Sequence, residues 1–471
     1  MFIHPEGNNR QDVDSVIRET TVALLDFLGN AAAAPPMPEW DGWLPATLLP
    51  EQGRTLKQVL QDVSAIFARS MNPANPRFLG HMDTVSSLPG AMAEFAAAAL
   101  NNNMLSVEMS PLLSRLEDRC MREVAAWFGL GEAAAGTMSS GGTLCNLQAL
   151  AVARNDALLC QAGGLTRQTG RPVLFASKAA HTSLQKAAMV LGLGSDAVIG
   201  IDVDSNFRMR PDALRNAIRA SRAAGEHPFC IVATAGTTTT GSIDPLVELA
   251  AISAQEALWF HVDAAYGGAV ILSNRHRHLL GGIELADSLT FNPQKWLYLP
   301  KTCATLLFRS RQRWYKAFRV GAPYTSDFDD LVNLGEVSLQ GTRHADVLKL
   351  WMSLQYAGKQ VQAGLIDSSM WLTRVFCDEL TRRPYLSLAT DPQLNLICFR
   401  GNFLKDAEQQ EHWNLSLQKH LNAGNIAFFS LTTLHGQSWL RAVLLNPHLQ
   451  VSHIVSIFGA IDVFHAQWLS A

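Results

Sequence analysis

Residues 289–296 read Leu-Thr-Phe-Asn-Pro-Gln-Lys-Trp and place Lys295 in a largely apolar stretch of the chain. Lysine is normally kept out of such surroundings, because desolvation penalises its charge. One chemistry makes use of this penalty, since a partly desolvated amine with a lowered pKa forms a Schiff base with a carbonyl group. The stretch therefore marks Lys295 as a candidate for covalent attachment of a carbonyl cofactor.

A second stretch, upstream of the first, supplies a carboxylate. Residues 261–268 read His-Val-Asp-Ala-Ala-Tyr-Gly-Gly, and Asp263 ends an apolar run that is typical of a buried strand. A carboxylate there can pair with a protonated pyridine nitrogen, which lets pyridoxal 5'-phosphate (PLP) act as an electron sink. Asp263 and Lys295 together indicate a PLP enzyme.

The composition is that of an ordinary globular protein with more than one domain, with 471 residues, 48% of them hydrophobic and 17% charged. A net charge of −3 gives no basic surface for nucleic acid. No apolar run reaches the ~18 residues of a membrane span, and the N-terminus lacks a signal-peptide pattern. Seven scattered cysteines fit neither a disulfide framework nor a metal site. We expect a cytoplasmic protein that binds no nucleic acid, membrane or metal.

The chain divides into three predicted parts. Residues 1–70 hold two helical patterns around a Pro/Ala-rich break, and we expect this N-terminal helical segment to pack on a partner subunit because it has little core of its own. Residues 71–360 form a predicted large domain, in which apolar runs alternate with helical patterns and indicate a mostly parallel α/β sheet. The clearest runs are 172–176, 197–201, 229–234 and 259–263. In residues 361–471, a long helix and two apolar runs indicate a small C-terminal α+β domain.

Gly141, Gly142 and Thr143 lead directly into an apolar helical run, residues 144–153. Glycines let the backbone approach an anion closely, and free N–H groups at a helix N-terminus point at it. Taken alone, the same residues fit a capped helix start after a flexible loop. In the company of Asp263 and Lys295, the sequence favours a phosphate-binding site.

Two more candidates follow predicted strands. His181 comes after the strand that ends at Ala176, which brings it to the carboxyl edge of the sheet, where α/β proteins bind ligands. An imidazole there can stack on a flat aromatic cofactor, and a helix cap or a structural histidine also fits the position. Residues 233–241, Ala-Thr-Ala-Gly-Thr-Thr-Thr-Thr-Gly, either expose hydroxyl groups at the same edge or form a simple turn.

Taken in order, these motifs resemble those of the PLP-dependent group II amino-acid decarboxylases, a family that includes the glutamate, cysteine-sulfinate, aromatic-amino-acid and diaminobutyrate enzymes. The resemblance covers residues 70–450. Residues 292–296 match the family's Asn-Pro-His-Lys-Trp block except at its third position, and residues 261–268 match its second block throughout. Residues 339–351 resemble the segment that closes the family's large domain, and residues 101–111 resemble the glutamate and cysteine-sulfinate branch.

The resemblance implies a fold-type I PLP-dependent transferase-like α/β fold, whose large domain has a mostly parallel seven-stranded sheet. It also implies a homodimer with the active site at the subunit interface. In this family, Lys295 would form the Schiff base with PLP, Asp263 would keep the ring nitrogen protonated, and His181 would stack on the ring. Six further positions match cofactor-site residues: Ala265 beneath the ring, Thr238 beside it, and Gly141, Gly142, Thr143 and Asn292 at the phosphate.

The implied reaction is the α-decarboxylation of an L-amino acid to the amine and CO2. An acid must then protonate Cα, and the family's mobile loop usually carries a tyrosine for this step. An ungapped match puts Phe328 at that position, and the nearest tyrosine, Tyr324, is the candidate acid. Gln294 replaces the family's histidine before the lysine, and an amide cannot exchange protons near neutral pH. Any acid–base role of that histidine is therefore lost or moved.

The side chain of the substrate stays open between diaminobutyrate-like, acidic and aromatic classes. His81, Asp83 and Thr84 match a segment that lines the family's substrate pocket, and an acid at position 83 favours a distal amine. Arg441 favours an acidic substrate, unless it contacts the α-carboxylate that all substrates share. The remaining candidates, which the resemblance assigns to the partner chain, are Asn103 and Leu105.

Other functions fit part of the same evidence. A decarboxylating aldehyde synthase becomes an alternative if the chain lacks an acid for Cα, and an aminotransferase would keep PLP but release a keto acid. A protein of another class, a non-catalytic PLP-fold protein that binds a partner, would not need Lys295, Asp263 and His181 intact.

Overall fold

The computed structural model describes residues 2–45, 48–323, 325–326, 328 and 331–470. The chain forms two compact units. The first comprises Met1–Val85, Arg374–Ser387 and Phe399–Ala471, and the second comprises Ser86–Thr373 and Leu388–Cys398. Within the described ranges, no helix combines the length and the apolar character that a bilayer crossing requires. The three-part division at residues 70 and 360 stays a prediction.

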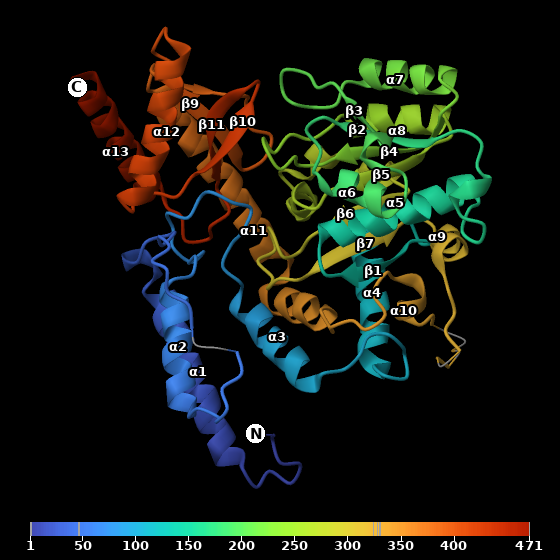
Figure 1. The fold of residues 1–471 in the computed structure, drawn as a ribbon, viewed down its shortest axis with the longest axis horizontal. Coiled ribbons are helices and arrows are strands. Elements are labelled where there is room, and N and C mark those ends of the chain that lie inside the picture. Colours follow the sequence, from blue (N-terminus) through green and yellow to red (C-terminus); the bar gives the residue numbers. More distant parts are fainter. Residues whose placement is uncertain (1, 46–47, 324, 327, 329–330, 471) are drawn as a thin grey trace. The chain divides into compact units, whose positions relative to one another are not determined.

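The second unit is built on a seven-stranded sheet with the strand order β1-β7-β6-β5-β4-β2-β3 (Figure 1). Strand β7 runs antiparallel to β1 and β6, and the other neighbouring strands pair in parallel. This confirms the mostly parallel seven-stranded sheet, and the four predicted runs become β2 to β5. The strands are β1 Ala135–Ser139, β2 Pro172–Ser177, β3 Val198–Ile201, β4 His227–Thr234, β5 Trp259–Asp263, β6 Ser288–Phe291 and β7 Ala304–Phe308.

Helices cover this sheet, as its apolar strands require. Every residue of β1, β5, β6 and β7 is buried. Helices α7 and α8 pack against each other and against β4, and α4 packs against β1. The helices of this unit are α3 Leu88–Leu100, α4 Pro111–Trp127, α5 Gly142–Leu158, α6 Ser183–Val190, α7 Pro211–Ala223, α8 Leu246–Gln255, α9 Arg311–Phe318, α10 Leu334–Val337 and the first part of α11 Val347–Thr381.

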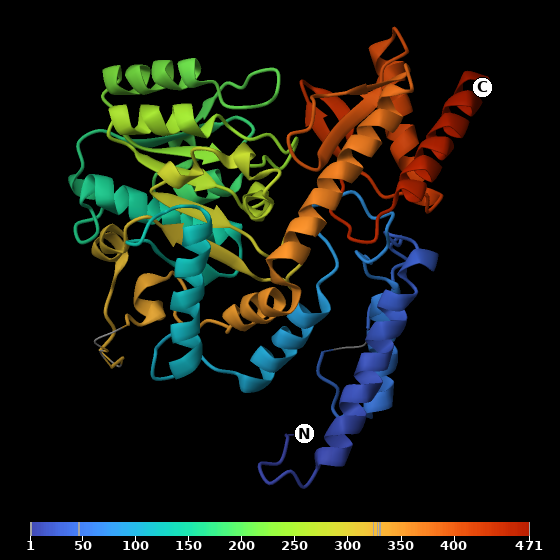
Figure 2. The same cartoon turned by 180° about the vertical axis from the view of Figure 1, so that it is seen from behind.

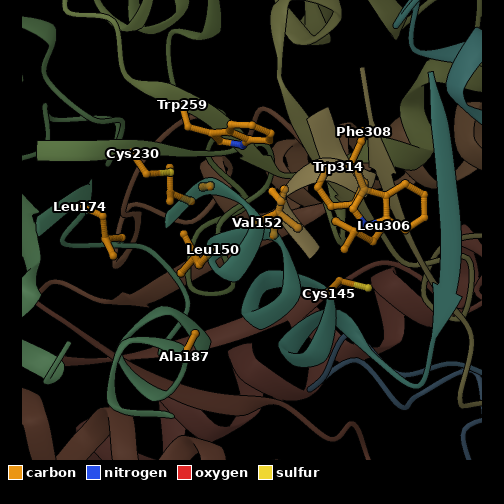
Figure 3. Close-up of a cluster of buried hydrophobic side chains, with 14 of the residues drawn as sticks. Cys145, Leu150, Val152, Leu174, Ala187, Cys230, Trp259, Leu306, Phe308 and Trp314 are labelled. Atoms are coloured by element: carbon orange, nitrogen blue, oxygen red, sulfur yellow. The ribbon is translucent and has the colours of Figure 1, made fainter. Parts of the chain in front are cut away.

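The core beneath one face of the sheet is centred on α5 (Figure 3). Apolar side chains of α5 share this core with side chains from five strands of the sheet and from α6 and α9. The labelled members of this core are Cys145, Leu150 and Val152 of α5, Leu174, Cys230, Trp259, Leu306 and Phe308 of the strands, Ala187 of α6 and Trp314 of α9. Because α5 is buried along most of its length, its N-terminus is held rigidly at the edge of the sheet.

Helix α11, drawn in orange in Figure 2, contains a break at Gly358, which adopts φ 67° and ψ 170°. These angles lie in a region that glycine reaches without strain. The long helix predicted from about residue 361 is therefore the second of two helical stretches. The break lies close to the predicted boundary at residue 360, whereas the compact unit ends at Thr373.

The first unit joins the N-terminal helices to the C-terminal segments. The rings of Phe27 and Phe67 stack at 5.3 Å between α1 and α2. Asn446 donates to the backbone carbonyl of Asn75 at 2.7 Å, which ties the segment before residue 85 to the C-terminal part. A four-stranded sheet has the order β10-β11-β9-β8. The elements are α1 Arg10–Gly29, α2 Leu56–Ala68, α12 Ala407–Ala423, β10 Ser430–Leu434, β11 Gln437–Val443 and α13 Val451–Ser470, together with β8 Leu386–Leu388 and β9 Leu396–Gly401, whose residues are divided between the two units.

Candidate active site

A cavity of about 340 Å³ opens at the carboxyl edge of the parallel strands of the second unit. Five strands end beside it, because β1, β2, β4, β5 and β6 each run into a segment of its wall. All nine residues that the sequence predicted as cofactor-binding line this one cavity. The lining residues are Ser140, Gly141, Gly142, Thr143, Leu144, Asn146, His181, Thr234, Gly236, Thr238, Asp263, Ala265, Tyr266, Asn292, Gln294 and Lys295.

One end of the cavity is formed by the start of α5. The helix has no side-chain cap, and the N–H groups of Leu144 and Cys145 both donate to the carbonyl of Gly141 at 3.1 Å, so the N–H groups of Gly142 and Thr143 are the ones without an acceptor within the helix. A Cβ on Gly142 would lie 3.0 Å from Nδ2 of Asn292 and 3.5 Å from Cβ of Ala265. The absence of a side chain at residue 142 therefore keeps these donors accessible to an anion.

Asp263 ends β5 in the wall of the cavity and is 6% exposed. Its Oδ2 accepts a hydrogen bond from Nδ2 of Asn146 at 2.8 Å, and its Oδ1 accepts one from the backbone N–H of Ala265 at 3.1 Å. Sequence reasoning missed Asn146. A signal was present, because Asn146 follows Gly142 by one helical turn and therefore shares its face of α5.

His181 lies between β2 and α6. Its Nδ1 accepts a hydrogen bond from the backbone N–H of Ser183 at 3.2 Å, so the proton of the neutral ring is on Nε2. Desolvation lowers the pKa of His181, while Asp263 opposes this shift and Lys295 adds to it. A neutral, flat imidazole in the cavity wall is suited to stacking on an aromatic ring.

Lys295 lies in the turn that follows β6. The backbone N–H of Lys295 donates to the carbonyl of Asn292 at 3.1 Å. Its Nζ lies 5.8 Å from the centre of the Tyr266 ring, which stacks at 5.2 Å on the fully buried ring of Trp296. Tyr266 is held in turn, because its hydroxyl donates to Oδ1 of Asn395 at 2.6 Å. The amine of Lys295 thus lies over an aromatic ring that is itself held in place by Trp296 and Asn395.

The threonine-rich loop after β4 contains buried threonines that bond within the loop and one threonine that lines the cavity. Thr237 and Thr240 are buried with their oxygens 2.9 Å apart, and Thr240 also contacts the hydroxyl of Ser242 at 2.7 Å. These groups stabilise the loop itself. Thr238 is exposed and lines the cavity. Of Thr237, Thr238 and Thr240, Thr238 is the one that lines the cavity and is therefore the candidate ligand contact.

The cavity wall has the donors and the shape for PLP. Oδ1 of Asn292 and Oγ1 of Thr234 are buried there with no hydrogen-bond partner among the described residues. The free N–H groups of α5 suit a phosphate, the carboxylate of Asp263 suits a ring nitrogen, and the amine of Lys295 suits an aldehyde. The residues present therefore fit this cofactor.

The other predicted site residues are not among the described residues that line this cavity. His81, Asp83, Thr84 and Arg441 belong to the first unit. There, Arg441 donates to the carbonyl of Gly80 at 2.9 Å. Asn103 and Leu105 belong to the second unit but are not among the described residues that line the cavity. Oδ1 of Asn103 accepts hydrogen bonds from the backbone N–H groups of Leu105 and Arg343. Tyr324, the candidate acid, lies outside the described residues.

A larger cavity, of about 640 Å³, lies elsewhere in the second unit beside α8 and α9. Three of its charged side chains pair with one another, since Arg313 contacts Asp156 at 2.6 Å and Asp287 at 2.8 Å. Arg313 also lies 4.5 Å above the ring of Trp259. Size alone therefore does not identify the active site, and the smaller cavity has the reactive groups.

Comparison with known proteins agrees with this geometry. Residues 43–402 match the family described as "Pyridoxal-dependent decarboxylase conserved domain". The L-2,4-diaminobutyrate decarboxylase of Rhizobium meliloti (strain 1021) is 34% identical over 418 residues, which cover 88% of this chain and 83% of the relative. The cysteine sulfinic acid decarboxylase of Homo sapiens is 32% identical over 357 residues, covering 74% and 72%. The crystal structure of mouse CSAD in apo form matches with a TM-score of 0.89 and 27% identity, covering 97% of this chain and 99% of that one. The chain belongs to the pyridoxal-dependent decarboxylase family and is a PLP-dependent amino-acid decarboxylase.

Proposed function

We propose that Lys295 holds PLP covalently through its amine, that Asp263 accepts a hydrogen bond from the protonated ring nitrogen, and that the start of α5 binds the phosphate. The observation that supports this most directly is that all three groups line one cavity at the carboxyl edge of the sheet. Bound PLP supplies an electron sink for the pair left on Cα when CO2 departs.

His181 and Ala265 complete the proposed cofactor site. We assign the neutral imidazole of His181 to stacking on the ring and the small side chain of Ala265 to packing beneath it. The backbone N–H of Ala265 donates to the carboxylate of Asp263, and this hydrogen bond keeps the two residues in a defined position relative to each other. The protein's contribution is thus to orient the substrate and to hold a proton at the ring nitrogen.

The proposed substrate is an L-amino acid with a distal amine. Asp83 supports this choice, because a carboxylate attracts an ammonium group and repels a second carboxylate. The similarity to the L-2,4-diaminobutyrate decarboxylase of Rhizobium meliloti points the same way. Arg441 supports an acidic substrate, but it already donates to the carbonyl of Gly80 and to Oγ of Ser430. We therefore assign Arg441 a role in shaping the residue 80 segment, with His81 and Thr84 as neighbours of the substrate.

We further propose a cytoplasmic homodimer in which Asn103 and Leu105 reach the partner's active site. Exposed apolar side chains on three helices support an association of this kind, because such side chains are costly to leave in water. They include Val22 and Leu25 of α1, Val59 of α2, and Leu88 and Phe95 of α3. Sedimentation analysis of the PLP-loaded chain at two concentrations tests the oligomeric state.

A substrate panel tests the activity. The PLP-loaded chain is incubated with L-2,4-diaminobutyrate, lysine, glutamate, aspartate, cysteine sulfinate and tyrosine, and CO2, amine, aldehyde, keto acid and hydrogen peroxide are quantified together. We expect CO2 and amine in equal amounts from diaminobutyrate, and no product from a Lys295→Ala control. Equal amounts from glutamate or tyrosine would overturn the choice of substrate but keep the reaction.

Phe328 favours a second reaction, in which decarboxylation is followed by oxidation by O2 and hydrolysis, so that the products are CO2, an aldehyde, ammonia and hydrogen peroxide. Phenylalanine has no acidic proton, so it cannot protonate Cα from the family's tyrosine position. In the panel, CO2 with aldehyde and peroxide would show this reaction. Tyr324→Phe separates the two possibilities, because it should abolish amine formation only if Tyr324 is the acid.

A further inference from the structure

A continuous row of buried polar side chains lies behind Asp263. Nε1 of Trp259 is 2.8 Å from Oγ of Ser288, and the same Oγ is 2.8 Å from Nδ1 of His261. Nε2 of His261 is 3.2 Å from Oδ1 of Asn146, whose Nδ2 is 2.8 Å from Oδ2 of Asp263. All five side chains are at least nine-tenths buried. None of the first four has been given a role above.

The chemistry of these groups determines the direction of every hydrogen bond. An indole N–H only donates, so Ser288 accepts from Trp259. An ionised carboxylate only accepts, so Asn146 presents its N–H group to Asp263 and its oxygen to His261. Nε2 of His261 must then carry the proton. The neutral ring accepts at Nδ1, and the hydroxyl of Ser288 donates to it.

The ring of His261 is neutral in this arrangement for a physical reason. Burial lowers its pKa to about 4, although Asp263 and a hydrogen bond at Ser288 oppose the shift. At neutral pH the ring therefore has one donor and one acceptor nitrogen, as the row requires.

Two contacts in addition to the one with His261 prevent the amide group of Asn146 from rotating by 180°. Its second N–H lies 2.9 Å from Oγ of Ser183, and its oxygen accepts from the hydroxyl of Thr290 at 2.8 Å as well as from His261. A flipped amide would place its oxygen against the carboxylate of Asp263. Such a buried contact between two acceptors is costly.

Strand register builds the row. Residues 259, 261 and 263 alternate along β5 and so share the face that α5 covers. In the paired strand β6, Ser288 stands opposite His261 and Thr290 stands opposite Asp263. Asn146 lies one turn into α5 and bonds to side chains of both strands, to His261 and Asp263 of β5 and to Thr290 of β6.

We propose that Asn146 and His261 are positioning residues that hold the carboxylate of Asp263 in one orientation toward the ring nitrogen of PLP. The inference rests on the proposed role of Asp263. The row passes from a donor-only group, Trp259, to an acceptor-only group, so a change at any member weakens the last bond. Oδ1 of Asp263 accepts from the backbone N–H of Ala265, and Asn146 provides the second hydrogen bond, to Oδ2, that prevents the carboxylate from rotating.

Four variants of the full chain test this: Asn146→Ala, His261→Leu, His261→Gln and Val262→Ala. Val262 is the matched control, because it is the next residue of β5, is fully buried like His261 and faces the other side of the sheet. Gln at 261 keeps an uncharged donor and acceptor. The measured quantities are the Kd of the apoenzyme for PLP, kcat and KM separately, the visible absorbance of the bound cofactor as a function of pH, and the unfolding midpoint.

We expect Asn146→Ala and His261→Leu each to raise the Kd for PLP and lower kcat by about 10-fold or more, since each weakens a hydrogen bond to a charged group. The double variant Asn146→Ala/His261→Leu should have a Kd and kcat close to those of either single variant, because both changes act through the same hydrogen bond to Asp263. His261→Gln should recover most of the loss, and Val262→Ala should change only the unfolding midpoint.

Asp263→Asn, measured alongside, separates two kinds of failure. If it abolishes activity while Asn146→Ala and His261→Leu behave like Val262→Ala, the positioning role is wrong and the proposed function stands. If Asp263→Asn itself keeps normal cofactor affinity and kcat, the assigned role of Asp263 is wrong. The inference would also be contradicted if Asn146→Ala and His261→Leu lowered the unfolding midpoint but the protein that remained folded bound PLP with an unchanged Kd.

Discussion

The side-chain oxygen of Gln294 accepts a hydrogen bond from the backbone N–H of Cys303 at 2.5 Å, and the backbone N–H of Gln294 donates to the carbonyl of Cys303 in return. Because a backbone N–H needs an acceptor, the amide oxygen must face Cys303. The NH2 group of Gln294 is therefore turned away from Cys303, and the residue lines the cavity beside Lys295. Where relatives have an ionisable histidine, this chain presents a donor whose charge does not change with pH.

Replacing Gln294 by histidine should make the enzyme sensitive to pH. We expect a new inflection in kcat/KM between about pH 5.5 and 7.5, with lower activity on the acid side, because an imidazolium ion beside Lys295 repels the cationic amine of the substrate. The measurement is the pH profile of kcat/KM for both proteins. Gln294→Leu serves as the control, since it removes the amide without adding an ionisable group. Identical profiles for Gln294→His and the wild type would contradict this placement.

Gly142→Ala should weaken PLP binding about 10-fold, a loss of about 1.4 kcal/mol. The added Cβ would lie 3.0 Å from Nδ2 of Asn292 and would close the approach to the start of α5. Absorbance titration of the apoenzyme with PLP measures the effect. The matched control is Gly364→Ala in α11, where a Cβ meets open space and should raise stability by about 0.5–1 kcal/mol without changing PLP affinity. An unchanged Kd in Gly142→Ala would show that the phosphate binds elsewhere.

Arg343→Met should lower the free energy of unfolding by about 3–5 kcal/mol, because it leaves the buried charge of Glu117 without its partner. Nη1 of Arg343 lies 3.0 Å from Oε1 of Glu117, Nη2 lies 3.2 Å from Oε2, and both residues are buried. Urea unfolding of the PLP-loaded chain measures the loss. Arg119→Ala is the control on the same helix α4, since its pair with Glu123 is exposed and should contribute almost nothing. Equal effects of the two variants would mean that water reaches the Arg343 pair.

Acid should destabilise the folded chain through His261. The pKa of His261 is about 4 in the folded state and about 6.5 when the ring is in water, so the unfolded state binds the proton more tightly between these values. The free energy of unfolding should fall as the pH drops from 6.5 toward 4, by at most about 1.4 kcal/mol per pH unit, and the contribution is complete above pH 6.5.

Urea unfolding at pH 7.0, 5.5 and 4.5 measures this slope. His261→Gln should make the slope shallower, because glutamine does not titrate. His278→Gln changes an exposed histidine and should keep the wild-type slope. A slope that His261→Gln leaves unchanged would assign the acid sensitivity to other groups.

The sheet and the cofactor cavity could be predicted from local sequence. Apolar runs of four to eight residues between helical patterns specify buried parallel strands, and the carboxyl ends of such strands meet at one edge. Lys295, Asp263, His181 and Thr238 each follow or end a strand, so connectivity alone brings them to the same cavity. Their chemical roles stay predictions that the variants above test.

The partners of these residues could not be predicted in the same way. Asn146 and Asp263 are separated by 117 residues, and Asn146 and His261 by 115, so no local pattern links them. Local sequence also does not distinguish Thr238 from Thr237. Their sequence context is nearly identical, yet Thr238 lines the cavity and Thr237 is buried against Thr240. Which threonine turns inward depends on the packing of the loop against Ser242.

The sequence by itself determined the family, the cofactor and the edge of the sheet at which the predicted cofactor residues meet, because these depend on which residue follows which strand. Only the tertiary structure decided the orientation of Asp263, the direction of the Gln294 amide and the burial of the Arg343 pair. The contacts of Asp263 and Arg343 join distant segments and depend on how α5 and α4 pack on the strands, whereas Gln294 and Cys303 are nine residues apart in the connection between β6 and β7. Periodicity along one segment contains no information about the register between two.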